Sequence, residues 1–265
     1  MTIDEQFNSI PKEDLPKHIA IIPNGNRTWA RLNGKTAQEG HNIGVEVLIN
    51  FARVIREWGI HTATVWGSST ENLVRRDPAE VKNLFRLLNY VLDTMGEEAH
   101  EDGVRLIHVG NKKKLPKELV KRIVEWEEKT KDNKNFVANI AFAYGGHDEL
   151  FRGMKKAFED IQEDKITFED LMEVTGLYQN KYPYHRFKDY LDTLDQPYPY
   201  PDLIIRTAGE HRLSGFMPWQ SVYSEYYSTE KLMPEMNEEE FKKAIIAYVH
   251  RDRSFGGDKT KPQNV

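Results

Sequence analysis

The sequence contains no cysteine, and this absence excludes disulfide bonds, thiolate catalysis and metal sites with cysteine ligands. It also lacks any apolar run near the roughly 20 residues that a membrane-spanning helix needs. The first residues show no basic stretch followed by an apolar stretch, so no secretory signal is visible. We therefore expect a soluble, cytoplasmic protein, for which a transient contact with a membrane surface stays open.

Positive charge is also in short supply. The 265 residues hold 37 lysines and arginines against 42 acidic residues, which gives a net charge of -5. A field of this sign repels polyanions, so we expect no nucleic-acid partner. Any anion that the protein binds must be held by a local cluster of arginines or backbone N–H groups.

Short β-branched runs alternate with longer amphipathic runs over most of the chain. We expect strands near 18–24, 62–68, 104–110, 136–146 and 202–209, and helices near 40–58, 79–103, 115–131, 148–161 and 237–253. Strands that alternate with crossover helices form a mainly parallel, twisted sheet flanked by helices. With 39% hydrophobic residues the chain fits a single large α/β domain. Such sheets bind ligands at the carboxyl ends of their strands.

The segment from 167 to 201 has the least regular pattern, with six tyrosines among four prolines. The pattern predicts a helix followed by a long excursion. Two interpretations of the excursion are open: a lid over a site, or a surface loop packed through its aromatic rings.

A turn follows the first expected strand, in the run Pro23-Asn24-Gly25-Asn26-Arg27-Thr28-Trp29. Glycine and asparagine tolerate the backbone of a tight turn, and the N–H groups that open the next helix can hold a phosphate. A turn of this composition is more often only a turn. By itself it is therefore a weak signal for phosphate binding.

A second cluster follows the strand near 202–209. It contains Arg206, Arg212 and Ser214 around a glycine-containing turn. Because guanidinium groups match phosphate oxygens in pairs, the cluster predicts a diphosphate clamp more strongly than a surface network of arginine and glutamate. Glu225, in a short tyrosine-rich strand further on, offers a carboxylate for Mg2+.

The run PDLIIRTAGEHRLSGFMPWQSVYSEYY at 201–227 resembles the signature of the cis-prenyltransferases, the family of undecaprenyl and dehydrodolichyl diphosphate synthases. The resemblance extends to HIAIIPNGNRTWARLNGKTAQEGHNIGVE, SSTENLVR, NIAFAYGG and RDRSFGG, in family order. We therefore expect an N-terminal extension at 1–17, a catalytic domain at 18–257 and a polar tail at 258–265. The resemblance implies a hydrophobic tunnel between sheet and helices, and usually a homodimer.

The resemblance also implies two sites for isoprenyl diphosphates at the tunnel mouth, one for an allylic primer and one for isopentenyl diphosphate. It gives the second site Arg206, Arg212 and Ser214, and makes Glu225 the Mg2+ ligand. It implies catalytic roles for Asn24, Asn26, His41 and Asn72. It implies substrate contacts for Gly25, Arg27, Trp29, Ser69 and Arg75. Without the resemblance, His41 is best explained as an ordinary histidine at a helix start.

Product length in such a tunnel depends on its depth. Candidate lining residues on the helix near 80–101 are Phe85, Leu88, Tyr90, Val91, Leu92 and Met95. Plain core packing explains each of them as well, so no product length follows from the sequence.

The first site departs from the family pattern at four positions. Asn24 replaces an aspartate, Thr28 and Ala37 replace arginines, and Leu73 replaces an aromatic residue. Asparagine keeps one carbonyl oxygen but loses the charge that the family uses to bind the metal and diphosphate. Three charge losses at one subsite predict a remodelled first site beside an intact second one.

Three functions are consistent with this pattern. The first is a prenyltransferase that condenses isoprenoid diphosphates with Mg2+ and a remodelled first site. The second is an irregular condensing or cyclising member of the lavandulyl type. The third is a catalytically silent accessory subunit of an active homologue. The complete clamp argues against the third, because a silent subunit has no need of one.

Overall fold

The computed structural model describes residues 1–178 and 182–252. Its centre is a six-stranded sheet in the order β3-β4-β2-β1-β7-β8, and each neighbouring pair is parallel. The strands are β1 (His18–Ile22), β2 (Thr62–Ser69), β3 (Val104–Val109), β4 (Phe136–Tyr144), β7 (Leu203–Arg206) and β8 (Glu225–Ser228). The predicted single α/β domain with a mainly parallel sheet is confirmed.

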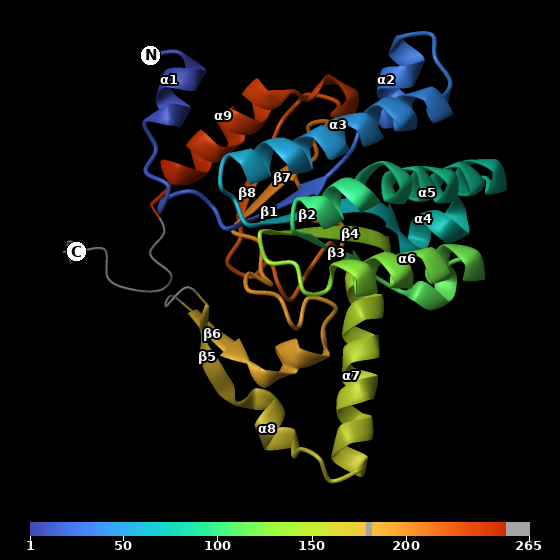
Figure 1. Cartoon of the computed structure of the whole chain (residues 1–265), viewed down its shortest axis with the longest axis vertical. Coiled ribbons are helices and arrows are strands. Elements are labelled where there is room, and N and C mark those ends of the chain that lie inside the picture. Colours follow the sequence, from blue (N-terminus) through green and yellow to red (C-terminus); the bar gives the residue numbers. More distant parts are fainter. Residues whose placement is uncertain (179–181, 253–265) are drawn as a thin grey trace.

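Helices cover both faces of this sheet, as Figure 1 shows, with α3, α5 and α9 on one side and α7 and α8 extending from the other. The helices are α1 (Ile3–Asn8), α2 (Asn26–Leu32), α3 (Ala37–Glu57), α4 (Thr70–Arg75), α5 (Pro78–Glu101), α6 (Lys117–Thr130), α7 (Gly146–Gln162), α8 (Phe168–Met172) and α9 (Glu238–Val249). No helix in the described ranges combines the length and apolar character needed to cross a membrane.

The main core lies between the sheet and the helices α3 and α9. Phe51 of α3 and Phe241 of α9 are fully buried, with ring centroids 4.6 Å apart, and pack with Ile19 and Ile205 of the central strands. The expected N-terminal extension joins this core, because Phe7 of α1 is buried and lies 4.6 Å from the ring of Trp58. The expected polar tail at 258–265 lies outside the described residues.

Helix α3 begins earlier than the hydrophobic pattern predicts. The side chain of Thr36 accepts from the backbone N–H of Glu39 at 3.3 Å, and the Glu39 carboxylate accepts from the Thr36 backbone N–H at 2.8 Å. This capping box starts the helix at Ala37. His41 is therefore the fifth residue of α3, near the helix end that lies at the carboxyl edge of the sheet.

The irregular segment forms a two-stranded antiparallel hairpin, β5 (Val174–Tyr178) and β6 (Tyr182–His185), followed by a 3-10 helix at Arg186–Tyr190. In Figure 1 the hairpin lies beside α8, on the side of the sheet opposite α3 and α5. The ring of Tyr184 packs edge-on against Tyr200 at 5.1 Å, and Trp219 donates to the Tyr200 hydroxyl at 3.1 Å. Aromatic packing at the surface is the interpretation that this arrangement supports.

Candidate functional site

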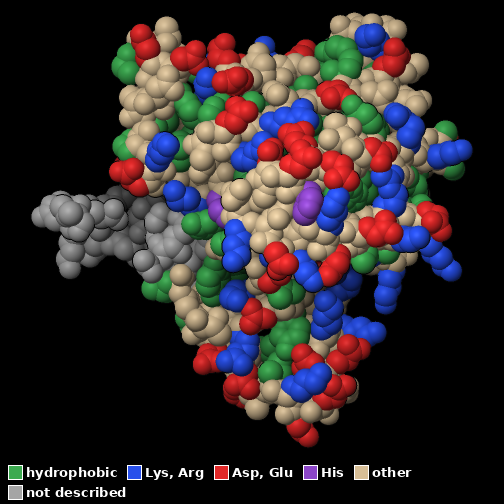
Figure 2. Space-filling model, in the orientation of Figure 1, with side chains coloured by type: hydrophobic (Ala, Val, Ile, Leu, Met, Phe, Trp, Pro, Cys, Tyr) green, Lys and Arg blue, Asp and Glu red, His purple; other side chains and the backbone are tan. Residues whose placement is uncertain are grey.

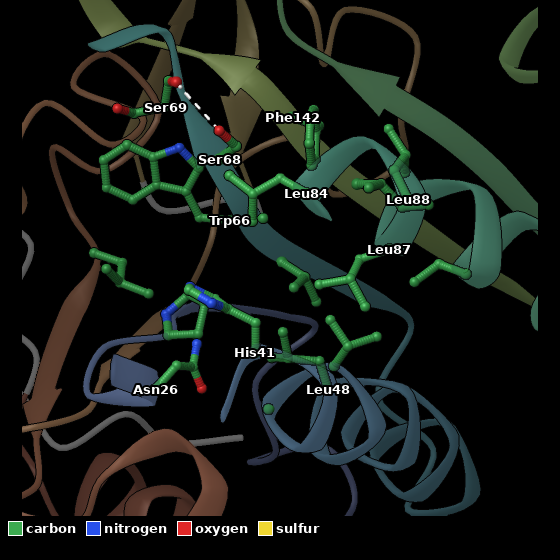
Figure 3. Close-up of a pocket in the computed structure, with 18 of the residues that line it drawn as sticks. Asn26, His41, Leu48, Trp66, Ser68, Ser69, Leu84, Leu87, Leu88 and Phe142 are labelled. Carbon is green, nitrogen blue, oxygen red and sulfur yellow. Dashed lines mark hydrogen bonds between the residues drawn. The ribbon is translucent and has the colours of Figure 1, made fainter. Parts of the chain in front are cut away.

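A cavity of about 410 Å³ opens at the carboxyl ends of β1, β2 and β7 and continues between the sheet and the helices α3 and α5. Its interior is apolar, as the view in Figure 3 shows around Leu48, Leu84, Leu87 and Leu88. Polar side chains gather at its mouth: Asn24, Asn26, His41, Ser68, Ser69, Glu71, Asn72, Arg76, Arg206 and Ser214. Such a cavity fits a ligand with a charged head and a long hydrocarbon tail.

The backbone of Asn24 is fixed just beyond the end of β1. Its N–H donates to the Thr207 hydroxyl at 2.7 Å, and its carbonyl accepts from the same hydroxyl at 2.8 Å and from the N–H of Met233 at 2.9 Å. Its side-chain Oδ1, in contrast, is buried without a hydrogen-bond partner among the described residues. A buried carbonyl oxygen in this state is available to a ligand that brings a donor or a cation.

Two glycines of α3 let Asn26 approach that helix closely. A Cβ at Gly40 would lie 2.3 Å from the Asn26 backbone oxygen, and one at Gly44 would lie 2.1 Å from its Oδ1. Gly25 holds φ at 94°, where a side chain would also meet Leu232 at 2.7 Å. These glycines explain the spacing GHNIG in physical terms, because any larger residue would displace the loop.

His41 faces the mouth from α3 and is buried. Its Nδ1 lies 2.8 Å from the Ala37 carbonyl, so this nitrogen donates, and its Nε2 lies 3.4 Å from Nη1 of Arg76 and accepts. Burial, followed by the charge of Arg76, lowers the pKa of His41. The imidazole is therefore neutral near pH 7 and can accept a hydrogen bond.

Ser69 and Asn72 form the start of α4 at the same edge. The Ser69 hydroxyl accepts from the Asn72 N–H at 3.1 Å, and the Asn72 amide oxygen accepts from the Ser69 N–H at 3.3 Å. Arg76 follows the helix and turns into the cavity, where its Nη1 donates to Glu80 at 2.8 Å. Arg75 is exposed and does not line the cavity.

Arg206 ends β7 and pairs in register with Ile22 of β1, which brings it beside the Asn24 loop. The residue is 3% exposed, and its Nη1 donates to the Ser214 hydroxyl at 3.0 Å and to the Arg212 carbonyl. No carboxylate of the described residues forms an ion pair with it, and its Nε has no partner there. Burial lowers the pKa of Arg206, which marks the cost of holding this cation without a counterion.

Several residues expected at the mouth lie elsewhere in the structure. Arg27 is exposed and Trp29 is half-buried on α2, and neither lines the cavity. Arg212 is exposed and forms an ion pair with Glu210. It contributes its backbone carbonyl to the clamp rather than its guanidinium.

Glu225 does not lie with the other expected metal and diphosphate groups. It pairs in register with Leu203, whereas Arg206 pairs with Ser228, so it lies three residues, roughly 10 Å, before the carboxyl edge of the sheet. Its carboxylate accepts from Arg251 at 2.8 Å. The expectation that Glu225 holds Mg2+ at the mouth is therefore not supported within one chain.

The mouth offers Mg2+ few charged ligands. No group of three or more His, Cys, Asp or Glu residues suited to a metal occurs in the described part of the chain. The unpaired amide oxygen of Asn24 and the carboxylate of Glu71, which both line the mouth, are nevertheless oxygen ligands of the kind that Mg2+ accepts when phosphates supply most of the charge. The site fits a metal that arrives with a diphosphate, because Glu71 is the one carboxylate in its described lining.

Comparisons with known proteins agree with this geometry. Residues 22–256 match the family described as "Putative undecaprenyl diphosphate synthase". The chain is 38% identical over 248 residues to an isoprenyl transferase of Clostridium perfringens, covering 94% of this chain and 92% of that one. The chain belongs to the undecaprenyl diphosphate synthase family.

One further relative and two solved structures are similar to this family member. A tritrans,polycis-undecaprenyl-diphosphate synthase (geranylgeranyl-diphosphate specific) of Picrophilus torridus is 39% identical over 252 residues, covering 94% of this chain and 93% of that one. The structure of lavandulyl diphosphate synthase from Lavandula x intermedia in complex with dimethylallyl diphosphate superposes with a TM-score of 0.81 at 32% identity, covering 92% and 99% of the two chains. The structure of a probable undecaprenyl diphosphate synthase from Campylobacter jejuni superposes with a TM-score of 0.69 at 29% identity, covering 91% of this chain and 98% of that one.

Four site residues of this synthase-family chain were missed in the sequence: Trp66, Ser68, Glu71 and Arg76. Ser68 is 2% exposed, and its hydroxyl donates to the Ser69 carbonyl at 3.3 Å, as the dashed line in Figure 3 marks. Trp66 points toward the mouth beside it. The hydrophobic alternation of β2 does not predict that Trp66 and Ser68 line the cavity, because the strand register shifts between Trp66 and Ser69.

Proposed function

We propose that the protein transfers a prenyl group from an allylic diphosphate to isopentenyl diphosphate. The observation that carries the proposal is Arg206, a buried guanidinium without a carboxylate partner among the described residues, at the mouth of an apolar cavity. Such a cation is stabilised when an anion binds, and a diphosphate with a hydrocarbon tail satisfies both the charge and the cavity.

The described side chains divide between two diphosphates. Arg206 and Ser214 bind and orient the isopentenyl diphosphate. Asn24, Asn26 and Arg76 face the primer diphosphate from the other side of the mouth. In the reaction the allylic carbon–oxygen bond breaks and its electron pair leaves with the diphosphate. The isopentenyl double bond then attacks the allylic carbon, and a proton passes to the released diphosphate.

Mg2+, when bound, neutralises charge on the leaving diphosphate. The unpaired amide oxygen of Asn24 would contact it, whereas the amide oxygen of Asn26 packs against Gly44 of α3. Because neither carries a charge, we infer that the first site is remodelled: it orients the primer through amide groups and Arg76. Thr28 and Ala37, where the family resemblance implies arginines, do not line the cavity.

A second candidate is an irregular condensation of the lavandulyl type. It is favoured by the likeness to lavandulyl diphosphate synthase, whose TM-score of 0.81 exceeds the 0.69 of the undecaprenyl-type structure. The loss of charge at Asn24 points the same way. Both candidates share the diphosphate clamp, so only the product separates them.

We also propose that the protein is a homodimer that works alone. Exposed hydrophobic side chains follow one face of α7 and continue over α8 and β5: Phe151, Met154, Phe158, Phe168, Met172, Val174 and Leu177. In Figure 2 hydrophobic side chains interrupt the charged surface at this lower end of the molecule. A stripe of this size on a folded chain indicates a protein interface, and a second copy is the occupant that closed symmetry provides.

The experiment is consumption of radiolabelled isopentenyl diphosphate with dimethylallyl, geranyl or farnesyl diphosphate and Mg2+, with products identified by mass. Turnover by the purified chain supports the proposal, and a regular or branched product chooses between the two candidates. The Asn24→Asp variant is the comparison. We expect it to turn over faster, because a carboxylate restores several kcal/mol of charge stabilisation. Inactivity of both proteins contradicts the proposal and favours an accessory subunit.

A further inference from the structure

Trp66 is held rigidly at the mouth of the cavity. Its Nε1 donates to the backbone carbonyl of Tyr144 at 3.2 Å. Its ring stacks on Phe216, with centroids 4.8 Å apart and planes inclined by 21°. One edge and one face of the indole are therefore occupied by protein, and the residue still lines the cavity.

The position of the ring is between the charged mouth and the apolar interior. Phe216, beneath the indole, follows two residues after Ser214 of the diphosphate clamp. Figure 3 shows Ser68 and Ser69 on one side of the indole, His41 and Asn26 on the other, and the leucines of α5 beyond it. The prenyl carbons of two substrates with their diphosphates at this mouth must pass the indole.

The neighbours of the ring leave it free to act on a cation. His41 is held neutral by burial, so it does not repel positive charge. Three charged side chains line the described cavity: the carboxylate of Glu71, Arg206, which donates to Ser214, and Arg76, which donates to Glu80. Asn24 brings no charge to the first site, so the carboxylate of Glu71 and the indole of Trp66 are the groups of the described lining that can attract a carbocation.

We propose that Trp66 is a catalytic residue that stabilises the carbocation by a cation–π interaction, a role that rests on the prenyl transfer proposed above. When the allylic carbon–oxygen bond breaks, the electron pair leaves with diphosphate and positive charge spreads over the allylic carbons. The free face of the indole attracts this charge. After the isopentenyl double bond attacks, the charge moves to the new tertiary carbon and disappears when a proton passes to diphosphate.

A purely structural role for Trp66 would affect charged and uncharged ligands alike. The test is therefore binding, measured by calorimetry, of geranyltrimethylammonium with inorganic diphosphate. Two comparison ligands are the uncharged isostere with carbon in place of nitrogen, and unreactive geranyl thiodiphosphate. The proteins are the wild type, Trp66→Leu, Trp66→Phe and Phe142→Leu. Phe142 is a matched control, because it is a buried aromatic that lines the cavity further inside.

We expect Trp66→Leu to weaken binding of the ammonium ion by about 10- to 30-fold while the two comparison ligands change by less than about threefold. Trp66→Phe should keep part of the affinity, since a smaller ring remains. Phe142→Leu should change the affinities for the ammonium ion and for its isostere by the same factor. In turnover, Trp66→Leu should lower kcat with little change in KM, and Trp66→Phe should rescue part of the rate.

Two outcomes overturn the inference, and they are distinguishable. If the wild type binds neither the thiodiphosphate nor the ammonium ion, the proposed function fails and the role of Trp66 fails with it. If the wild type binds both ligands, and Trp66→Leu weakens binding of the ammonium ion and of its isostere equally, only the role of Trp66 fails. Thermal unfolding identifies a misfolded Trp66→Leu, and the comparison of wild type with Trp66→Phe then decides.

Discussion

Nη1 of Arg206 lies 3.0 Å from the hydroxyl oxygen of Ser214, inside the protein and beside the first turn of the chain after β1. The hydroxyl is held there by an unusual backbone, since φ is 52° at Ser214 and 80° at Gly215. A left-handed conformation costs free energy at Ser214 that the surrounding structure must offset, whereas glycine adopts it readily. The clamp is therefore built in advance of its ligand, at the expense of stability.

The first prediction separates binding from stability at Arg206. Arg206→Met should weaken binding of inorganic diphosphate by roughly 10- to 150-fold, because hydrogen bonds to a charged group contribute about 1.5–3 kcal/mol. The same change should leave the free energy of unfolding unchanged or raise it, since it removes a buried cation without a counterion. Calorimetry and urea unfolding measure the two quantities. A variant that loses stability and keeps its affinity contradicts the clamp.

The second prediction uses two adjacent arginines as a matched pair. Arg76→Met should raise KM for the allylic diphosphate by about tenfold, the effect of one lost charge-assisted contact. Arg75→Met should change it by less than about twofold, because Arg75 is exposed and does not line the cavity. Steady-state kinetics decides. Equal effects of the two changes would show that the mouth is arranged differently when substrate binds.

This pair also shows where prediction from sequence stops. Alternating hydrophobic patterns predict the sheet, its parallel order and the strand-end position of Asn24 and Arg206. These patterns are reliable because every strand and helix must bury its apolar residues in the core. Which of two neighbouring arginines enters the mouth depends on where α4 ends, and Arg76 leaves it with an extended backbone, ψ 157°. Family resemblance suggested Arg75. Helix ends are set by single caps and shift by one residue without changing any periodicity.

The interior of the cavity was predicted in part. Leu88, Val91 and Met95 line it, whereas Phe85, Tyr90 and Leu92 do not. A helix of 24 residues that packs on both a sheet and α6 has more than one buried face, so amphipathic spacing selects buried residues without saying which neighbour they contact. The hairpin at β5 and β6 was not predicted, since its tyrosines pack as well on a surface as over a site.

The third prediction concerns acid. Burial lowers the pKa of His18 to about 3, below its ordinary value near 6.5, and burial also lowers that of His108 to about 4. Between about pH 6.5 and 4 the unfolded chain binds protons that the folded chain does not. Stability should therefore fall with pH in this window, by up to about 1.4 kcal/mol per pH unit for each histidine.

Urea unfolding at about pH 7 and about pH 5 measures this slope. His18→Gln should lower stability near neutral pH, because His18 Nε2 lies 2.7 Å from the Thr64 hydroxyl oxygen, and should make the slope shallower. His211→Gln, at an exposed position, is the control and should leave the slope unchanged. An unchanged slope in His18→Gln contradicts the assignment.

The fourth prediction addresses the apolar stripe on α7. Phe151 and Phe158 are 69% and 58% exposed on one helix face. Phe151→Glu with Phe158→Glu should convert a dimer to monomers, because two charges would be buried at the interface at a cost of several kcal/mol. Sedimentation equilibrium measures the mass. Lys156→Glu, on the other face of the same helix, is the charge control, and a wild type that sediments as a monomer contradicts the dimer.

The last prediction concerns the wall of the cavity at Leu88. This side chain lines the main cavity and also a second void of about 10 Å³ between α5, α6 and the sheet, whereas Leu92, one turn on, lines the second void alone. Leu88→Ala should join the two spaces, and Leu92→Ala should enlarge the second one without joining them. Both should cost about 2–5 kcal/mol of stability, since each leaves a hole in the same packed layer.

If the main cavity holds the growing hydrocarbon chain, only Leu88→Ala can lengthen the product. Mass spectrometry of extracted products from the two variants tests this, with thermal unfolding to confirm that they are equally destabilised. A longer product from both variants would mean that general loosening, and not the wall at Leu88, sets the length. An unchanged product from Leu88→Ala would mean that the chain ends before it reaches α5, so that the limit lies nearer the mouth.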